Sequence, residues 1–286
     1  MTAGKGFDMA TAGVTSHFLE VPGARLHYDV RGTGPLLVLN GVPMGTKGFA
    51  AMAPLLADDY TVVTYDPRGM FRSTVEDPAQ ETTPELLADD LHRLVANLDA
   101  GPAHLFGSSG GAVTGLALVA RHPDQVRTFV AHEPPLAELL ADREQLRAAT
   151  GEVCEVYVND GREAALKRYT VMTGIDRFSQ PPRHLQSTAE FTEPVDVRAV
   201  LDRFFRHLLR PTACYRPDLA ALRSASTRIV VAAGTTSRGQ LAHRAAVALA
   251  AELAVPLVDF PGDHTGFQSE PEAFADGLRR VLSATP

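Results

Sequence analysis

The chain has 286 residues, of which 45% are hydrophobic and 21% charged, a composition typical of a globular protein with a sizeable core. Its formal net charge of −7 argues against nucleic acid and anionic membranes as partners, because an acidic surface repels both. No stretch approaches the roughly 18 consecutive apolar residues that a membrane span needs, which argues against a membrane protein.

The N-terminal segment does not resemble a secretory signal, because it lacks a long apolar stretch. Residues 1–15 are rich in Gly, Ala and Thr and predict a flexible leader. We therefore expect a cytoplasmic protein. The two cysteines, Cys154 and Cys214, fit neither a disulfide framework nor a metal-ligand pattern, so we expect buried thiols and no metal.

From residue 16 onward, strand-like and helix-like segments alternate. The predicted strands are His17–Val21, Arg25–Val30, Leu36–Leu39, Tyr60–Tyr65, Ala103–Phe106 and Val126–Ala131. The predicted helices lie near Phe49–Leu56, from Thr83 to Leu98 and over Ala112–Ala120. The run Thr83-Pro84-Glu85 marks a helix start, since a hydroxyl side chain caps helices well and proline suits the first turn.

Between about Pro134 and Arg223 the alternation stops and no strand-like run is present. Helices are predicted over Leu136–Thr150, Arg162–Thr173 and Val195–Leu209, with interruptions at Pro181-Pro182 and Pro211. The alternation then resumes with strands at Arg228–Ala233 and Pro256–Phe260 and helices at Gly239–Leu253 and Glu270–Leu282.

This order predicts an α/β fold with a doubly wound, mostly parallel eight-stranded sheet. The helical segment reads as a lid inserted after the sixth strand, over the edge where such sheets bind ligands. We expect a flexible leader at 1–15, a core of 16–135 and 224–286, and a helical lid, or cap, at 136–223.

The motif G-x-S-x-G occurs as Gly107-Ser108-Ser109-Gly110-Gly111, between a predicted strand and a predicted helix. In that setting Ser109 occupies a sharp turn that exposes its hydroxyl as a nucleophile. The N–H of Gly110 then points toward the oxygen of the attacked group. The alternatives are a structural turn with a solvated serine, or a phosphate-binding loop. The latter is disfavoured because neither G-x-G-x-x-G nor a G-K-[ST] ending is present.

A serine hydroxyl needs a base, and His264 is the candidate. It lies in Pro261-Gly262-Asp263-His264-Thr265-Gly266-Phe267, after the last predicted strand and therefore at the same sheet edge as Ser109. The other nine histidines lack this context.

The base in turn needs an orienting carboxylate. In this arrangement the acid usually follows the next-to-last strand, but here Ser237 stands in that segment. Glu133, at the end of the strand after the nucleophile helix, is the preferred candidate. Asp263 is the alternative, although neighbouring side chains rarely point at each other's ring. Glu133 could instead be a solvated loop residue or a helix cap.

The second oxyanion donor is expected from Asn40-Gly41-Val42-Pro43, which follows the third strand. Gly41 permits close backbone approach and Val42 offers an N–H, and the sequence does not choose between them. Asn-Gly is also an ordinary turn signal. In Asp66-Pro67-Arg68-Gly69, an Asp–Arg pair more often holds a loop than performs chemistry.

Together these residues resemble the α/β-hydrolase superfamily from about Phe18 to Leu282. The resemblance rests on four segments. They are the oxyanion loop (Asn40-Gly41-Val42-Pro43), the D-x-R-G turn (Asp66-Pro67-Arg68-Gly69), the nucleophile elbow (Gly107 to Gly111) and the histidine loop (Gly262-Asp263-His264). Asn40 replaces the histidine that the superfamily usually has, and Ser237 replaces the usual acid.

Within the superfamily, the chain is similar to the zearalenone-lactonase-like branch, whose triad acid follows the sixth strand. This likeness rests on Gly32-Thr33-Gly34-Pro35, Tyr65-Asp66, Gly69-Met70, Arg72-Ser73, the Ser109 elbow and His132-Glu133 with Pro135. The resemblance implies lactone hydrolysis by a Ser–His–Glu triad under a helical lid. Because the chain has no tryptophan to stack on a resorcylic ring, we transfer the fold and the triad but not the substrate.

We therefore predict a serine hydrolase that cleaves a carboxylic ester or lactone through an acyl-enzyme and uses no cofactor. Apolar lid side chains point to a small apolar substrate, although most of them are expected in the core of the lid rather than in the pocket wall. They are Met172, Phe178, Phe191, Phe204, Phe205 and Tyr215. The alternatives are a carbon–carbon bond hydrolase, a cofactor-free peroxidase, or a catalytically silent ligand-binding protein. The sequence leaves the oligomeric state open, a homodimer included.

Overall fold

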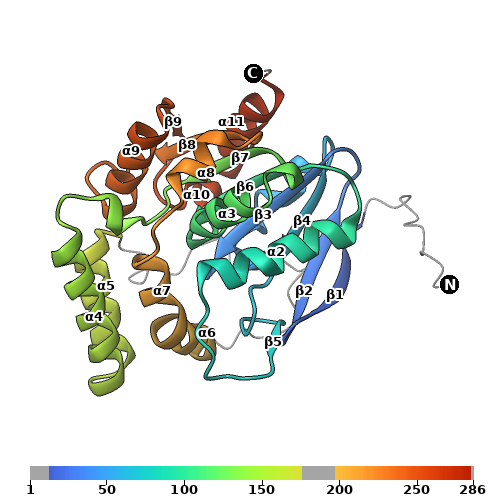
Figure 1. Ribbon diagram of the computed structural model, residues 1–286. Coiled ribbons are helices and arrows are strands. Elements are labelled where there is room, and N and C mark those ends of the chain that lie inside the picture. Colours follow the sequence, from blue (N-terminus) through green and yellow to red (C-terminus); the bar gives the residue numbers. More distant parts are fainter. Residues whose placement is uncertain (1–12, 176–196, 285–286) are drawn as a thin grey trace.

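A single mixed sheet forms the centre of the structure, a computed structural model that describes residues 13–175 and 197–284 (Figure 1). The strands follow the order β1-β2-β4-β3-β6-β7-β8-β9. Their bounds are β1 Thr15–Val21, β2 Ala24–Arg31, β3 Leu36–Val42, β4 Thr61–Tyr65, β6 Ala103–Ser109, β7 Val126–His132, β8 Arg228–Gly234 and β9 Leu257–Phe260. The first two strands run antiparallel to their neighbours, and β4, β3, β6, β7, β8 and β9 are parallel.

This sheet confirms the predicted fold class. The sequence did not predict β5 (Thr74–Val75), which pairs with Ala24 and Arg25 of β2. Two residues are too few to show an alternation of polarity, so such a strand leaves no pattern in the sequence.

Helices cover both faces of the sheet. One apolar cluster joins it to α2 (Pro84–Leu98), α3 (Gly110–Arg121), α8 (Leu219–Ser224) and α9 (Leu241–Leu253). A second cluster joins it to α1 (Ala53–Leu56), α10 (Gly266–Ser269) and α11 (Pro271–Ser283). Along β3, Leu36 and Val38 belong to the first cluster and Leu37 and Leu39 to the second. Successive side chains thus enter opposite cores, which explains the continuous apolar run in the sequence.

The predicted start of α2 is confirmed. The Thr83 hydroxyl accepts a hydrogen bond of 3.2 Å from the N–H of Leu86, and Pro84 is the first helical residue. By contrast, the helix predicted over Phe49–Leu56 is wrong in part, because the chain forms a 3-10 turn, η1 (Thr46–Phe49), and then the short α1. Helices α8 and α10, each shorter than two turns, were not predicted from the sequence.

A helical insertion spans residues 143–213, with its described elements at 143–173 and 197–213. It contains α4 (Arg143–Asn159), α5 (Arg162–Thr173), α6 (Val197–Arg203), the π-helical turn η5 (Phe204–Leu208) and α7 (Leu209–Ala213). Figure 1 shows α4 and α5 side by side at one end of the molecule, with α7 packed against α4.

Two predicted helices in this region need correction. The helix expected over Leu136–Thr150 is instead a 3-10 turn, η3 (Ala137–Leu139), then an extended Leu140, and then α4. This break buries Leu140 in one cluster with Leu146 and Leu241. The helix expected over Val195–Leu209 is described from Val197 only.

Pro211 does not interrupt the helix but lies inside α7. The π-turn directly before it changes the hydrogen-bond register, which accommodates a residue without an N–H. Pro181, Pro182, Phe178 and Phe191 lie outside the described residues, as do residues 1–12 of the predicted leader.

Cys154 and Cys214 are free, as expected, but both are only partly buried. Within the two described ranges, no helix combines the length and the apolar character that a membrane crossing requires.

Removing the N-cap hydroxyl of α2 tests whether it stabilises the start of this helix. We expect Thr83→Ala to lower the free energy of unfolding by about 1 kcal/mol, because the N–H of Leu86 loses its acceptor. Urea denaturation measures the change. Thr83→Ser, which keeps the hydroxyl, should retain most of the stability, and equal losses in both variants would contradict the capping role.

Candidate active site

Ser109 ends β6 and directly precedes α3, and its backbone is in the left-handed region with φ 57° and ψ −126°. Glycines surround Ser109 because there is no room for side chains at these positions. A Cβ on Gly107 would lie 2.7 Å from the carbonyl oxygen of Gly111, and one on Gly111 would lie 2.1 Å from that of Asn40. No larger residue fits without moving backbone, so the motif holds the serine in a strained turn at the sheet edge.

Gly110 is the first residue of α3, so its N–H belongs to a helix N-terminus, where partial positive charge favours an anion. Val42 pairs with Ser109 across β3 and β6, and both Val42 and Gly110 line a cavity beside the serine. Gly41 is not among the described residues that line this cavity. A Cβ there would lie 2.9 Å from the ring of Phe49. Of the two candidate second donors, Val42 is therefore the better placed.

Asn40, one of the two departures from the superfamily pattern, is fully buried and connects β3 and β4 to the nucleophile elbow. Its amide nitrogen donates to the carbonyl oxygen of Gly111 at 2.9 Å, and its amide oxygen accepts from the Tyr65 hydroxyl at 3.0 Å. Asn40 thus ties the end of β3 to the first turn of α3. This role of Asn40 was not predicted from the sequence.

His264 and Glu133 meet beside the end of β7. The Nδ1 atom of His264 lies 2.6 Å from Oε2 of Glu133, and both residues are buried. The other carboxylate oxygen accepts from the N–H of Gly234 at 2.9 Å and from the hydroxyl of Ser237. Ser237, in the segment where an acid is usually found, therefore donates a hydrogen bond to the carboxylate that contacts His264. A hydroxyl residue shortly after the next-to-last strand was the feature of the sequence that could have indicated this hydrogen bond.

This environment keeps Glu133 ionised. Burial alone would raise the pKa of Glu133, but the hydrogen bond from His264, the positive charge that His264 and His132 carry when protonated, and the hydrogen bond from Ser237 outweigh it. Together they lower the pKa of Glu133 to about 2.

Asp263, the alternative acid, is exposed. Its Oδ1 atom accepts from the N–H of Thr265 at 2.8 Å and from the Thr265 hydroxyl at 2.9 Å. The structure therefore brings Glu133 and His264 together and leaves Asp263 in a local turn.

A second buried histidine lies behind this pair. His132 is fully buried, and its Nδ1 atom lies 3.3 Å from the Ser108 hydroxyl. Burial lowers the pKa of His132 to about 4, so the ring is neutral at pH 7 and adds no charge beside Glu133.

The D-x-R-G turn holds neighbouring segments in place, as expected. Asp66 and Arg68 do so through different partners. Asp66 accepts from the N–H and the hydroxyl of Thr46, each at 2.9 Å, and from Nε of Arg72 at 3.0 Å. Arg68 instead donates to Asp90 at 2.7 and 2.5 Å.

Ser109 and His264 line the same cavity, of about 630 Å³. Apart from these two, its wall is mostly apolar and combines the oxyanion loop with the helical insertion. The lining residues are Val42, Pro43, Met44, Lys47, Gly48, Phe71, Gly110, Pro135, Ala137, Thr150, Tyr169, Met172, Thr173, Ile175, Val197, Val200, Leu201, Phe204, Leu208, Leu209, Thr212, Ala213, Leu241 and Gln268.

Two of the predicted lid side chains, Met172 and Phe204, do line this cavity. Phe205 instead stacks on Tyr157 inside the insertion, and Tyr215 packs against the core. Among the described residues, no three His, Cys, Asp or Glu side chains are grouped as a metal ion would require.

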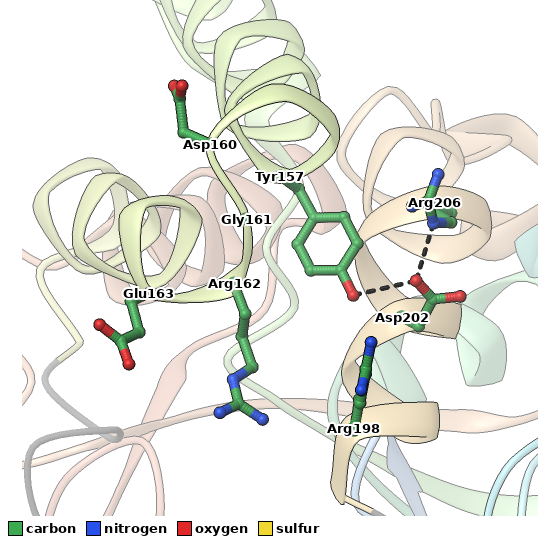
Figure 2. A pocket seen from close by; sticks show the side chains of 8 residues that line it. All are labelled: Tyr157, Asp160, Gly161, Arg162, Glu163, Arg198, Asp202 and Arg206. Atoms are coloured by element: carbon green, nitrogen blue, oxygen red, sulfur yellow. Dashed lines mark hydrogen bonds and ion pairs between the residues drawn. The ribbon is translucent and has the colours of Figure 1, made fainter.

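A second hollow, of about 490 Å³, lies between the α4–α5 turn and α6 with η5 (Figure 2). Charges of both signs line it, and Asp202 accepts from Arg206 at 2.7 Å and from Tyr157 at 3.0 Å. None of the predicted catalytic residues lines it. The apolar cavity is therefore the candidate active site.

The chain matches the family described as "alpha/beta hydrolase fold" over residues 34–170. It is 36% identical over 269 residues to the uncharacterized hydrolase YraK of Bacillus subtilis (strain 168), an alignment that covers 92% of this chain and 94% of the relative. A zearalenone hydrolase of Bionectria ochroleuca is 26% identical over 259 residues, covering 88% of this chain and 92% of that protein. The resemblance predicted from the motifs is thus confirmed, and the zearalenone hydrolase is a distant homologue.

Solved structures with the same fold include an enol-lactonase from Burkholderia xenovorans LB400, with a TM-score of 0.69 and 19% identity over 94% of this chain and 100% of that one. A thermophilic esterase from Thermogutta terrifontis gives a TM-score of 0.71 and 22% identity, covering 95% and 98% of the two chains. At such identities the likeness shows a shared fold and no more.

The low pKa of Glu133 predicts how stability depends on pH. Because this pKa, about 2, lies below the ordinary 4.5, the folded protein binds fewer protons at this site than the unfolded chain. The stabilising contribution is complete above pH 4.5 and is lost as the pH falls toward 2.

Glu133→Gln should therefore show a shallower loss of unfolding free energy between pH 4.5 and 2 than the parent protein. Urea denaturation at a series of pH values measures this slope. Asp263→Asn, at an exposed carboxylate, is the matched control and should keep the parent slope. A parent-like slope in Glu133→Gln would contradict the assigned pKa.

Proposed function

We propose that this chain, which belongs to the α/β-hydrolase family, is a serine hydrolase that cleaves a carboxylic ester or a lactone. One observation carries the proposal. A histidine whose Nδ1 atom is held 2.6 Å from a buried carboxylate lines the same cavity as a serine on a strand-to-helix turn. A hydroxyl, an imidazole and an anchored carboxylate are the groups that nucleophilic acyl transfer requires.

In the first step, Nε2 of His264, the ring nitrogen opposite Glu133, takes the proton of the Ser109 hydroxyl. The serine oxygen attacks the carbonyl carbon and forms a tetrahedral intermediate. The N–H groups of Gly110 and Val42 receive the oxyanion, and a single such donor is typically worth on the order of 10²–10³ in rate.

Glu133 acts through His264. A carboxylate with a pKa of about 2 stays ionised at neutral pH, so it stabilises the imidazolium and fixes the ring tautomer that leaves Nε2 free to accept a proton. His264 then protonates the leaving alcohol and activates the water that hydrolyses the acyl-enzyme. The alcohol and acid of a lactone leave as one molecule.

The apolar wall of the cavity supports a small substrate that is apolar over most of its length. In this proposal residues 16–135 and 224–286 form the catalytic core, and the 136–223 segment acts as the lid. The relative named as a zearalenone hydrolase supports ester or lactone chemistry over carbon–carbon bond cleavage.

Covalent labelling tests whether Ser109 is a nucleophile. A fluorophosphonate probe should modify the protein, and peptide mass spectrometry should place the adduct on Ser109. The Ser109→Ala variant should remain unlabelled and should lose hydrolysis of short p-nitrophenyl esters by about 10⁴-fold or more. Ser108→Ala is the matched control and should still be labelled. An unlabelled parent protein would point to a silent binding protein.

Paired substitutions test which carboxylate orients His264. Glu133→Gln should reduce kcat by on the order of 10³–10⁴, because the amide favours the wrong ring tautomer. Asp263→Asn should change kcat less than about threefold, since this side chain is exposed and accepts hydrogen bonds from Thr265 in a local turn. Steady-state kinetics on one p-nitrophenyl ester suffices, and the reverse ranking would make Asp263 the orienting acid.

A further inference from the structure

We infer that the ring of Phe71 contacts the apolar body of the substrate, so that the protein selects esters or lactones with an apolar group of several carbon atoms. This inference rests on the proposed function and narrows it. Phe71 lies between β4 and β5, just after the D-x-R-G turn, and it would recognise the substrate without taking part in the chemistry.

Phe71 has an uncommon backbone conformation. Its φ of 52° lies in the left-handed region, which bulky residues rarely adopt because the side chain crowds the backbone. Two hydrogen bonds fix the chain around it. The N–H of Met70 donates to the carbonyl oxygen of Pro67, and the N–H of Ser73 donates to that of Met70, both at 3.0 Å. Turns with a positive φ at the first central position usually carry Gly, Asn or Asp there, so the backbone disfavours a phenylalanine.

The same conformation occurs at the proposed catalytic residues. In the described part of the chain, five residues other than glycine have a positive φ, and they are Phe71, Asp99, Ser109, Glu133 and Ala254. Asp99 and Ala254 cap the C-terminal ends of α2 and α9, where a left-handed residue is common. Ser109 and Glu133 are the proposed nucleophile and orienting acid. Since backbone strain persists mainly where function needs a particular side-chain position, a strained Phe71 beside them indicates a functional role.

The side chain of Phe71 reaches the substrate cavity. It lines this cavity together with the serine and the histidine of the proposed triad, and it is only partly buried. A Cβ on Gly45, two residues after the oxyanion loop, would lie 2.7 Å from the ring of Phe71. The ring also packs against an apolar cluster that contains Val42 of the core and Phe204 of the insertion. Phe71 therefore lies where the oxyanion side of the core meets the insertion.

The position of the ring defines the substrate class. The surface that Phe71 presents to the cavity is apolar, and a substrate that covers it removes apolar area from water. Such contacts are worth roughly fourfold in affinity for each methylene group that is fully buried. The acetate of a short alcohol offers little surface for this contact. A medium-length or cyclic apolar group, on an ester or a lactone, offers enough.

Two series of esters test the contact. p-Nitrophenyl esters from acetate to octanoate vary the acyl side, and alkyl acetates from methyl to octyl vary the alcohol side. In at least one series, kcat/KM of the parent protein should rise with chain length. Phe71→Ala should flatten this rise, so that the loss on the longest ester exceeds the loss on the shortest by about tenfold, mainly through KM. Phe71→Leu, which keeps an apolar side chain, should retain most of the rise.

Phe18→Ala is the matched control, because Phe18 is an exposed phenylalanine of β1 and is not among the described residues that line the cavity. It should keep the chain-length dependence of the parent protein. A purely structural role of Phe71 would instead lower kcat/KM equally for short and long esters. Equal losses along both series, an unchanged chain-length dependence in Phe71→Ala, or a parent protein with no rise in either series would overturn the inference.

Phe71→Gly separates the strain of the backbone from the contact of the ring. Glycine adopts a positive φ readily, so this variant should unfold at a higher urea concentration than Phe71→Ala. Its chain-length dependence should nevertheless be as flat as that of Phe71→Ala. Equal unfolding midpoints in the two variants, or a parent-like chain-length dependence in Phe71→Gly, would overturn the inference.

A ligand with no bond to hydrolyse keeps this test separate from that of the proposed function. Calorimetric titration with methyl hexyl ketone should show binding to Phe71→Ala that is about fivefold or more weaker than binding to the parent protein. Equal binding would overturn the inference even if a fluorophosphonate labels Ser109. Weaker binding by the variant, when the parent protein stays unlabelled, would overturn the hydrolase proposal but retain the apolar contact.

Discussion

The arrangement of the site depends on one buried carboxylate and on the groups that keep it charged. An unpaired ionised carboxylate inside a protein is strongly unfavourable, so Glu133 must find donors or take up a proton. It finds them in His264, Gly234 and Ser237, which follow or end other strands of the sheet. The ends of β7, β8 and β9 thus converge on a single charge, and that convergence sets the position of the imidazole.

The nucleophile side of the site depends on close backbone packing rather than on charge. Gly107 and Gly111 have no room for a Cβ, and the amide of Asn40 bridges β3 to the carbonyl oxygen of Gly111. A neutral amide serves well in this position, because it donates to one backbone group and accepts from Tyr65 without adding a charge near Ser109. The two departures from the superfamily pattern, Asn40 and Ser237, therefore both have structural explanations.

The helical insertion supplies most of the apolar wall of the cavity, whereas Ser109 and His264 come from the core. The proposed catalytic groups lie at strand ends, whose positions the fold constrains, whereas most apolar side chains of the cavity come from the insertion. Membership of the family therefore establishes a hydrolase fold, whereas the substrate depends on the lining of the cavity, which is mostly apolar.

Local features were determined by the sequence itself. The alternation of strands and helices, the cap at Thr83 and the elbow at Ser109 each depend on a few consecutive residues, so their patterns survive without tertiary information. The pairing of Glu133 with His264 was also predicted, but the hydrogen bonds of Glu133 to Gly234 and Ser237 and the role of Asn40 were not, because they join residues far apart in the chain. The preference for Val42 over Gly41 depends on which of them lines the cavity, and the break at Leu140 on the burial of that side chain beside Leu241. Only the tertiary structure decided these points, since each rests on the packing of distant segments against one another.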